Sequence, residues 1–149
     1  SNPPTAGKFF KVDVFTAQVD DRTEDIIKKM NEKIYTHVPI YENGKYIGTF
    51  SENTLLLWLS DNIKDGNADF RKSKLSDVNK KYLNSPNDIV EFISEKTSIF
   101  DVKQKFEDAI KNRKRLGALF ITPSGEKNHF PPTGIITAYD LSKIDEYLK

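Results

Sequence analysis

Two residues near the C-terminus, Thr137 and Asp140, have the types and the spacing to hold a ligand. They lie in the segment "GIITAYDL", in which an apolar run precedes them. A threonine three residues before an acid is the spacing of a capping box at a helix N-terminus. A helix N-terminus also presents free N–H groups to a phosphate, and a carboxylate can accept both hydroxyls of a ribose. The segment therefore predicts a helix cap whose atoms could also contact a nucleotide.

A second segment, "GTFSENTL", has nearly the same layout. Gly48 lies 86 residues before Gly134 (134 − 48), and this offset aligns Ser51 with Thr137 and Thr54 with Asp140. A threonine hydroxyl does not offer a diol the two charged acceptors of a carboxylate. We therefore expect Ser51 to cap its helix, a weaker site at Ser51 and Thr54, and at most one strong nucleotide site per chain.

The two segments close two similar series of predicted elements. The first has a strand at 14–19, a helix at 20–33, two strands within 36–51 around the turn pair Asn43-Gly44, and a helix at 52–62. The second has a strand at 90–94, a helix at 97–114, strands at 115–122 and 133–137, and a helix at 138–148. The order β-α-β-β-α occurs twice, which predicts an α/β (α+β) fold built from two repeats.

Apolar residues at helical spacing predict the buried faces of these helices. The buried face of the helix at 20–33 is expected to consist of Ile26, Ile27, Met30 and Ile34. The buried face of the helix at 97–114 is expected to consist of Ile99, Val102, Phe106 and Ile110. That of the helix at 52–62 is expected to consist of Leu55, Leu56, Trp58 and Leu59. Thr97 or Ser98 is the expected cap of the helix at 97–114.

The predicted boundaries divide the chain into four parts. Residues 1–11 read as a tag remnant and lead-in, 12–61 as the first repeat, 62–89 as a connector and 90–148 as the second repeat. The connector is polar and turn-rich, with one short apolar anchor at Leu75 and Val78. Surface loops of this kind tolerate added length at small entropic cost.

Composition narrows the function classes. The 149 residues are 37% hydrophobic and 30% charged, which is typical of a globular protein, and the formal net charge of +1 does not favour nucleic-acid binding. The absence of cysteine excludes disulfides and agrees with a reducing cytoplasm. No apolar stretch approaches the ~20 residues of a membrane helix. We expect a cytoplasmic protein with no membrane insertion.

The repeats resemble a tandem pair of cystathionine-β-synthase (CBS) domains, also called a Bateman module. The resemblance is carried by "THVPIYENGKYIGTFSENTL" and by "RLGALFIT" with "TGIITAYDL". It implies two units packed about a pseudo-two-fold axis, with clefts that commonly bind AMP, ADP, ATP, S-adenosylmethionine or cyclic di-AMP. It also implies a regulatory role, no catalytic residues and frequent stacking of two pairs into a homodimer.

The resemblance also implies roles for individual residues. The aspartate at position 140 would take the ribose and Thr137 the phosphate. Thr16 and the pair Ile93-Ser94 occupy places where family members contact the purine, although each is equally compatible with an ordinary strand end. The repeat places His37 beside the cleft, where a polar edge residue is the alternative. The basic run that ends at Arg115 places this side chain to reach a phosphate, or leaves it as a solvated cation near a helix end. The small Gly117 leaves room for a flat base, or allows tight packing.

Two functions agree with these features. The first is a regulatory adenine-nucleotide-binding module with its ligand in the second-repeat cleft. The second is a ligand-free dimerisation or protein-interaction module that uses the apolar residues of "LLLWL" and of the closing helix. Neither a Gly-x-Gly-x-x-Gly or P-loop motif nor a Ser-His-Asp or His-x-x-x-His arrangement occurs, so we expect no enzymatic activity, no catalytic cofactor and no metal.

Overall fold

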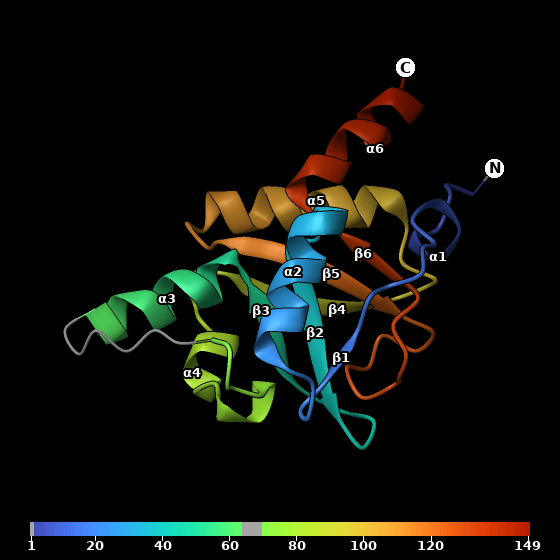
Figure 1. The fold of residues 1–149 in the computed structure, drawn as a ribbon. Helices are drawn as coiled ribbons and strands as arrows, with labels where there is room; N and C mark the ends of the chain where they lie inside the picture. The colour runs from blue at the N-terminus through green and yellow to red at the C-terminus, as the bar shows by residue number, and fades with distance from the viewer. Residues whose placement is uncertain (1, 64–69) are drawn as a thin grey trace. The chain divides into compact units, whose positions relative to one another are not determined.

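The computed structural model describes residues 2–63 and 70–149 (Figure 1). The chain divides into two compact units. The first-repeat unit is Phe15–Ser85, and the second-repeat unit combines the residues up to Val14 with Pro86–Lys149. Each unit contains a three-stranded sheet and is described by itself below.

The sheet of the first-repeat unit has the order β1-β2-β3. Its strands are Ala17–Gln18, His37–Glu42 and Lys45–Ser51, with β1 parallel and β3 antiparallel to β2. The helices α2 (Thr23–Lys33) and α3 (Glu52–Asn62) follow β1 and β3. Asn43 and Gly44 have φ values of 50° and 78°, as the predicted hairpin turn requires. The connector adds the 3₁₀ turn η2 (Leu75–Asp77) and the short helix α4 (Lys80–Leu83).

The sheet of the second-repeat unit repeats this topology with the order β4-β5-β6. Its strands are Ile89–Ser94, Leu116–Thr122 and Gly134–Ile136, again parallel and then antiparallel. The long helix α5 spans Ile99–Lys111, the 3₁₀ turn η3 spans Ala138–Asp140, and α6 spans Leu141–Tyr147. The short helix α1 (Ala6–Phe9) belongs to the same unit. The predicted mixed fold and the double β-α-β-β-α order are confirmed.

Each sheet is covered by its own apolar core. Phe50 and Ile40 are fully buried in the first-repeat unit, as are Leu119 and Ile121 in the second. Burying a side chain of this size stabilises the fold by about 1.5–3 kcal/mol relative to leaving it exposed. The predicted anchor of the connector is part of the first core, since Leu75 is 1% exposed.

The lead-in to each repeat is packed in the other unit. Ala6 and Phe10, which precede the first repeat, are core residues of the second-repeat unit. Leu83, which precedes the second repeat, is a core residue of the first-repeat unit. The glycines predicted to align allow this approach: a Cβ on Gly134 would lie 2.6 Å from the Phe10 carbonyl oxygen, and one on Gly48 2.6 Å from Leu83 Cβ. The pattern of residues 1–11 predicts a lead-in and does not indicate this core role.

Four expected core positions are wrong. Ile34 is 85% exposed because α2 ends there, with Ile34 in the left-handed conformation at a φ of 58°. Ile110, in the last turn of α5, is 75% exposed. Leu56 is 64% exposed and forms a stripe with the exposed Leu59 of α3 and with Ile63, the C-cap residue of this helix. Periodicity places residues on a helix face, but it does not report where the helix loses its packing partner.

Candidate functional site

Four of the predicted site residues lie at one end of the second-repeat sheet: Arg115, Gly117, Thr137 and Asp140. β6 pairs Ile136 with Leu119, so the next residue, Thr137, continues toward the start of β5. Gly117 is the extra residue of a β-bulge, because Ile89 pairs with Leu116 while Val90 pairs with Ala118. A bulge changes the direction of the chain locally and is common beside binding sites.

Asp140 closes the turn that Thr137 begins. Its Oδ2 accepts the backbone N–H of Thr137 at 2.9 Å and the Thr137 hydroxyl at 3.4 Å. Its Oδ1 lies 3.4 Å from the ammonium of Lys143, one turn later, and the Asp140 side chain keeps 25% of its surface exposed. The predicted helix cap is confirmed, and the second carboxylate oxygen lies outside the cap, beside the Lys143 ammonium.

The corresponding pair in the first-repeat unit is closed. The Ser51 N–H donates to Thr54 Oγ1 at 2.9 Å, and the Thr54 N–H donates to Ser51 Oγ at 3.4 Å. The Thr54 hydroxyl donates in turn to the carbonyl of Thr49 at 3.3 Å, and Thr54 has no exposed surface. The cap predicted for Ser51 is confirmed, but Thr54 has no atom to present to a ligand.

The other first-repeat residues lie near this cap. His37 pairs with Ser51 across β2 and β3, and its Nδ1 is 2.8 Å from the Thr36 hydroxyl. Thr16 precedes β1, where Ala17 pairs with Ile40, so Thr16 lies about two residues, or ~7 Å, along the sheet from His37. The structure therefore brings His37, Ser51 and Thr54 together and leaves Thr16 beside them.

Ile93 and Ser94 are not brought to the Thr137 end. Ser94 pairs with Thr122 at the far end of β5, four residues or ~13 Å from the level of Val90 and Ala118. The side chain of Ile93 is in the core, at 4% exposure. The β4 residues at the Thr137 end are Ile89 and Val90, which the sequence analysis missed.

A constant offset in the sequence aligns the equivalent strand positions of the two repeats. Ile26 and Val102 are 76 residues apart (102 − 26), and so are Ala17 and Ile93 (93 − 17). The sheets agree, because Ala17 lies in one row with Ile40 and Gly48, and Ile93 in one row with Ile121 and Gly134. Thr16 is therefore equivalent to Phe92 rather than to Ile93 or Ser94.

The basic segment before β5 contributes Arg115 from an exposed position. Its carbonyl oxygen accepts the N–H of Ile89 at 2.8 Å, which fixes the backbone at this point, while its side chain is exposed. Lys114 instead lines a small cavity of about 200 Å³ with Glu91 and Asp108. Arg115 thus has its backbone held at the Gly117 end of the sheet and its cation in solvent.

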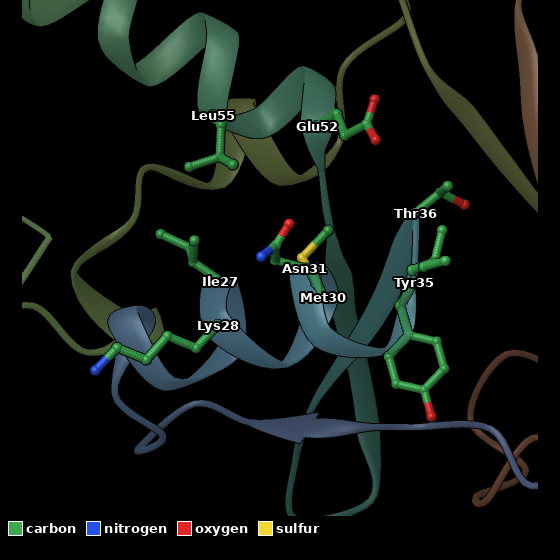
Figure 2. A pocket seen from close by; sticks show the side chains of 9 residues that line it. Ile27, Lys28, Met30, Asn31, Tyr35, Thr36, Glu52 and Leu55 are labelled. Atoms are coloured by element: carbon green, nitrogen blue, oxygen red, sulfur yellow. The ribbon is translucent and has the colours of Figure 1, made fainter.

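A larger hollow of about 530 Å³ opens in the first-repeat unit between the end of α2 and the start of α3 (Figure 2). Its apolar wall includes Ile27, Met30 and Leu55, and its polar rim includes Thr36 and Glu52. Figure 2 shows Glu52 and Leu55 on α3 above the α2 residues. This surface was not predicted as a site.

Two further observations concern metals and membranes. Residues 2–63 and 70–149 contain no group of three His, Asp or Glu side chains placed to hold a metal ion. None of the described helices combines the length and the apolar character that a bilayer span requires.

Comparisons with known proteins identify the fold. Residues 7–61 match the family model of the CBS domain. The structure is similar to a putative acetoin utilization protein of Vibrio cholerae (TM-score 0.67, 18% identity, 99% of this chain and 93% of that one). It is also similar to CBSX2 of Arabidopsis thaliana in complex with AMP (TM-score 0.65, 14% identity, 97% and 98%). No curated protein matches the sequence.

A third similar structure is longer than this chain. It is a putative archaeal homologue of γ-AMPK from Methanocaldococcus jannaschii (TM-score 0.65, 18% identity), and the chain covers 49% of it while 97% of the chain is matched. The chain thus has the fold of a tandem pair of CBS domains, and the resemblance found in the sequence is confirmed.

Proposed function

We propose that this chain is a regulatory module that binds an adenine nucleotide at the Thr137 end of the second-repeat sheet. The observation that carries the proposal is the carboxylate of Asp140, which caps η3 through Oδ2 and keeps Oδ1 outside the cap. The AMP complex of CBSX2, which has the same fold, supports the ligand class.

The polar groups at this end of the sheet contact different parts of the ligand in the proposed complex. Oδ1 of Asp140 accepts the ribose hydroxyls, because an ionised carboxylate makes stronger hydrogen bonds than a neutral acceptor. The Thr137 hydroxyl and the first N–H groups of η3 face a phosphate, and Arg115 adds a cation that can bind phosphate oxygens in pairs. The bulge at Gly117 leaves space for the base. The module acts by binding and not by catalysis.

The first-repeat unit is proposed to bind the same ligand weakly or not at all through Ser51, Thr54 and His37. Its equivalent of Asp140 is a neutral side chain without exposed surface, already donating to a carbonyl. Regulation then follows from the binding of one ligand per chain. The bound ligand shifts the conformational equilibrium of the chain toward the conformation for which it has the higher affinity.

A second candidate function is self-association. The stripe of Leu56, Leu59 and Ile63 on α3 is 39–76% exposed, and Tyr147 and Leu148 at the end of α6 are about half exposed. Apolar patches of this kind commonly mark interaction sites. A homodimer formed by these helices is compatible with nucleotide binding, and without a ligand it would be the main function.

A thermal-shift panel with AMP, ADP, ATP, S-adenosylmethionine and cyclic di-AMP tests the proposal. A ligand at 100 times its Kd adds about 2.7 kcal/mol to the free energy of unfolding. At least one ligand should stabilise the parent and not Asp140→Ala, while Asp13→Ala, an exposed acid in the same unit, should respond like the parent. If no ligand acts, or if Asp140→Ala responds fully, the site is not the one proposed.

A further inference from the structure

A hollow of about 630 Å³ lies in the second-repeat unit, away from Thr137 and Asp140. It is lined by the lead-in segment, by Glu95 and Lys96 in the loop after β4, and by Thr133 before β6. Glu95 follows Ser94, which pairs with Thr122 at the far end of β5 from Gly117. This hollow and the proposed nucleotide site therefore lie at opposite ends of the same sheet.

Backbone hydrogen bonds fix the walls of this hollow. The N–H of Gly7 donates to the carbonyl of Glu95 at 3.0 Å, and the N–H of Val12 donates to that of Thr133 at 3.2 Å. The contact at Gly7 is close enough that a Cβ there would lie 2.5 Å from Glu95 Cβ. The hollow is therefore a product of the packed fold and not of loosely placed side chains.

The side chains that line the hollow carry more positive than negative charges. Lys8, Lys11 and Lys96 contribute three ammonium groups, and no ion pair joins any of them to another described residue. The one carboxylate, that of Glu95, accepts the Thr133 hydroxyl at 3.1 Å. Like charges gathered around one concave surface raise the local concentration of anions.

We propose that this hollow binds a small phosphate compound with three or more negative charges, independently of the nucleotide site. Lysine ammonium groups are compact charges that bind phosphate well, and three of them match the charge of a polyphosphate better than that of a single carboxylate. The volume lies within the 300–1,000 Å³ that is usual for small-molecule sites. The hydroxyl of Thr5 supplies a neutral donor at the same surface.

Calorimetric titration of the full chain with inorganic tripolyphosphate at low salt tests this site. The variant Lys8→Gln/Lys11→Gln/Lys96→Gln should bind at least tenfold more weakly than the parent. The control Lys45→Gln/Lys127→Gln/Lys149→Gln removes the same number of charges from exposed lysines outside the lining and should bind nearly as tightly as the parent. Asp140→Ala should leave the affinity unchanged, so failure here is distinguishable from failure of the nucleotide proposal.

Amide NMR spectra locate the ligand during the same titration. Tripolyphosphate should shift the resonances of Lys8, Lys11, Lys96 and Thr133 and leave those of Thr137 and Asp140 in place. The proposal is overturned if tripolyphosphate does not bind at millimolar concentration, if both triple variants lose affinity equally, or if the shifts gather around Asp140.

Discussion

The N–H of Thr137 donates to Oδ2 of Asp140 at 2.9 Å, the same bond that the Ser51 N–H makes to Thr54 Oγ1 at 2.9 Å in the other repeat. The two caps have the same hydrogen-bond connectivity, but they differ in the atoms and exposed surface that the accepting side chain has left for a ligand. Asp140 keeps a second oxygen and exposed surface, while Thr54 keeps neither. One position thus distinguishes the two repeats.

Thr54→Val should destabilise the first-repeat unit without affecting nucleotide binding. The substitution leaves the Ser51 N–H without its buried acceptor, which costs about 1–3 kcal/mol. Urea unfolding should show this loss, and the affinity for the best ligand of the panel should stay within twofold. Asp140→Ala, the change at the equivalent position of the other repeat, should weaken binding of the ligand instead. A large loss of affinity in Thr54→Val would contradict a closed first site.

Phe10→Ala should destabilise the second-repeat unit by about 3–5 kcal/mol, the usual cost of truncating a buried phenylalanine. Phe10 is 4% exposed and lies in the core with Ile121 and Ile136. Denaturant unfolding measures the change, and Val12→Ala, at a neighbouring residue that is 44% exposed, is the control. A cost below 1 kcal/mol would mean that the lead-in is not part of this core.

Ile34→Gly should stabilise the chain by about 1 kcal/mol, because the left-handed conformation is unfavourable for a β-branched residue and open to glycine. Ile34 has a φ of 58° and is 85% exposed, so little packing is lost. Ile110→Gly is the matched control, since Ile110 is 75% exposed within α5 and should lose stability. Thermal unfolding of both variants should give shifts of opposite sign.

Tyr82→Phe should raise the pKa of Asp61 toward its ordinary value. The Tyr82 hydroxyl donates a hydrogen bond to the Asp61 carboxylate. This bond is the main cause that holds the pKa of the Asp61 carboxyl below its usual range, and a hydrogen bond from the Lys81 ammonium is the second. A lowered pKa in the folded state gives stability that is present above the unfolded-state pKa and lost as pH falls through the folded one. Carboxyl NMR titration measures the shift, with Tyr139→Phe as the control. An unchanged pKa in Tyr82→Phe would sink this assignment.

Local sequence predicted the elements well because each carries its own signal. The helix expected at 52–62 is α3, and the Asn43-Gly44 turn lies between β2 and β3, since capping and turn chemistry act over a few residues. Ser98 is the cap of α5, as one of the two candidates predicted.

Contacts between distant segments could not be predicted. The sequence does not show that Ile93 and Ser94 lie at the opposite end of the sheet from Thr137, because strand composition does not state the register, and a register fixes which residues share an end of a sheet. The packing of α1 depends on partners far away in sequence, such as Phe10 and Gly134 (134 − 10 = 124), and that of α4 depends on Gly48, 35 residues before Leu83 (83 − 48 = 35). The sequence pattern within either helix does not indicate which distant residues the helix packs against.

The most direct test of the nucleotide site is the affinity for AMP of the parent and of Asp140→Asn, measured by calorimetry. Asparagine retains an oxygen that can accept the Thr137 N–H, so the cap should survive while the charged acceptor for the ribose is lost. We expect AMP to bind Asp140→Asn at least tenfold more weakly than the parent, with an unfolding midpoint close to that of the parent. Equal AMP affinity in the two proteins would contradict the assignment of Asp140 as the ribose acceptor.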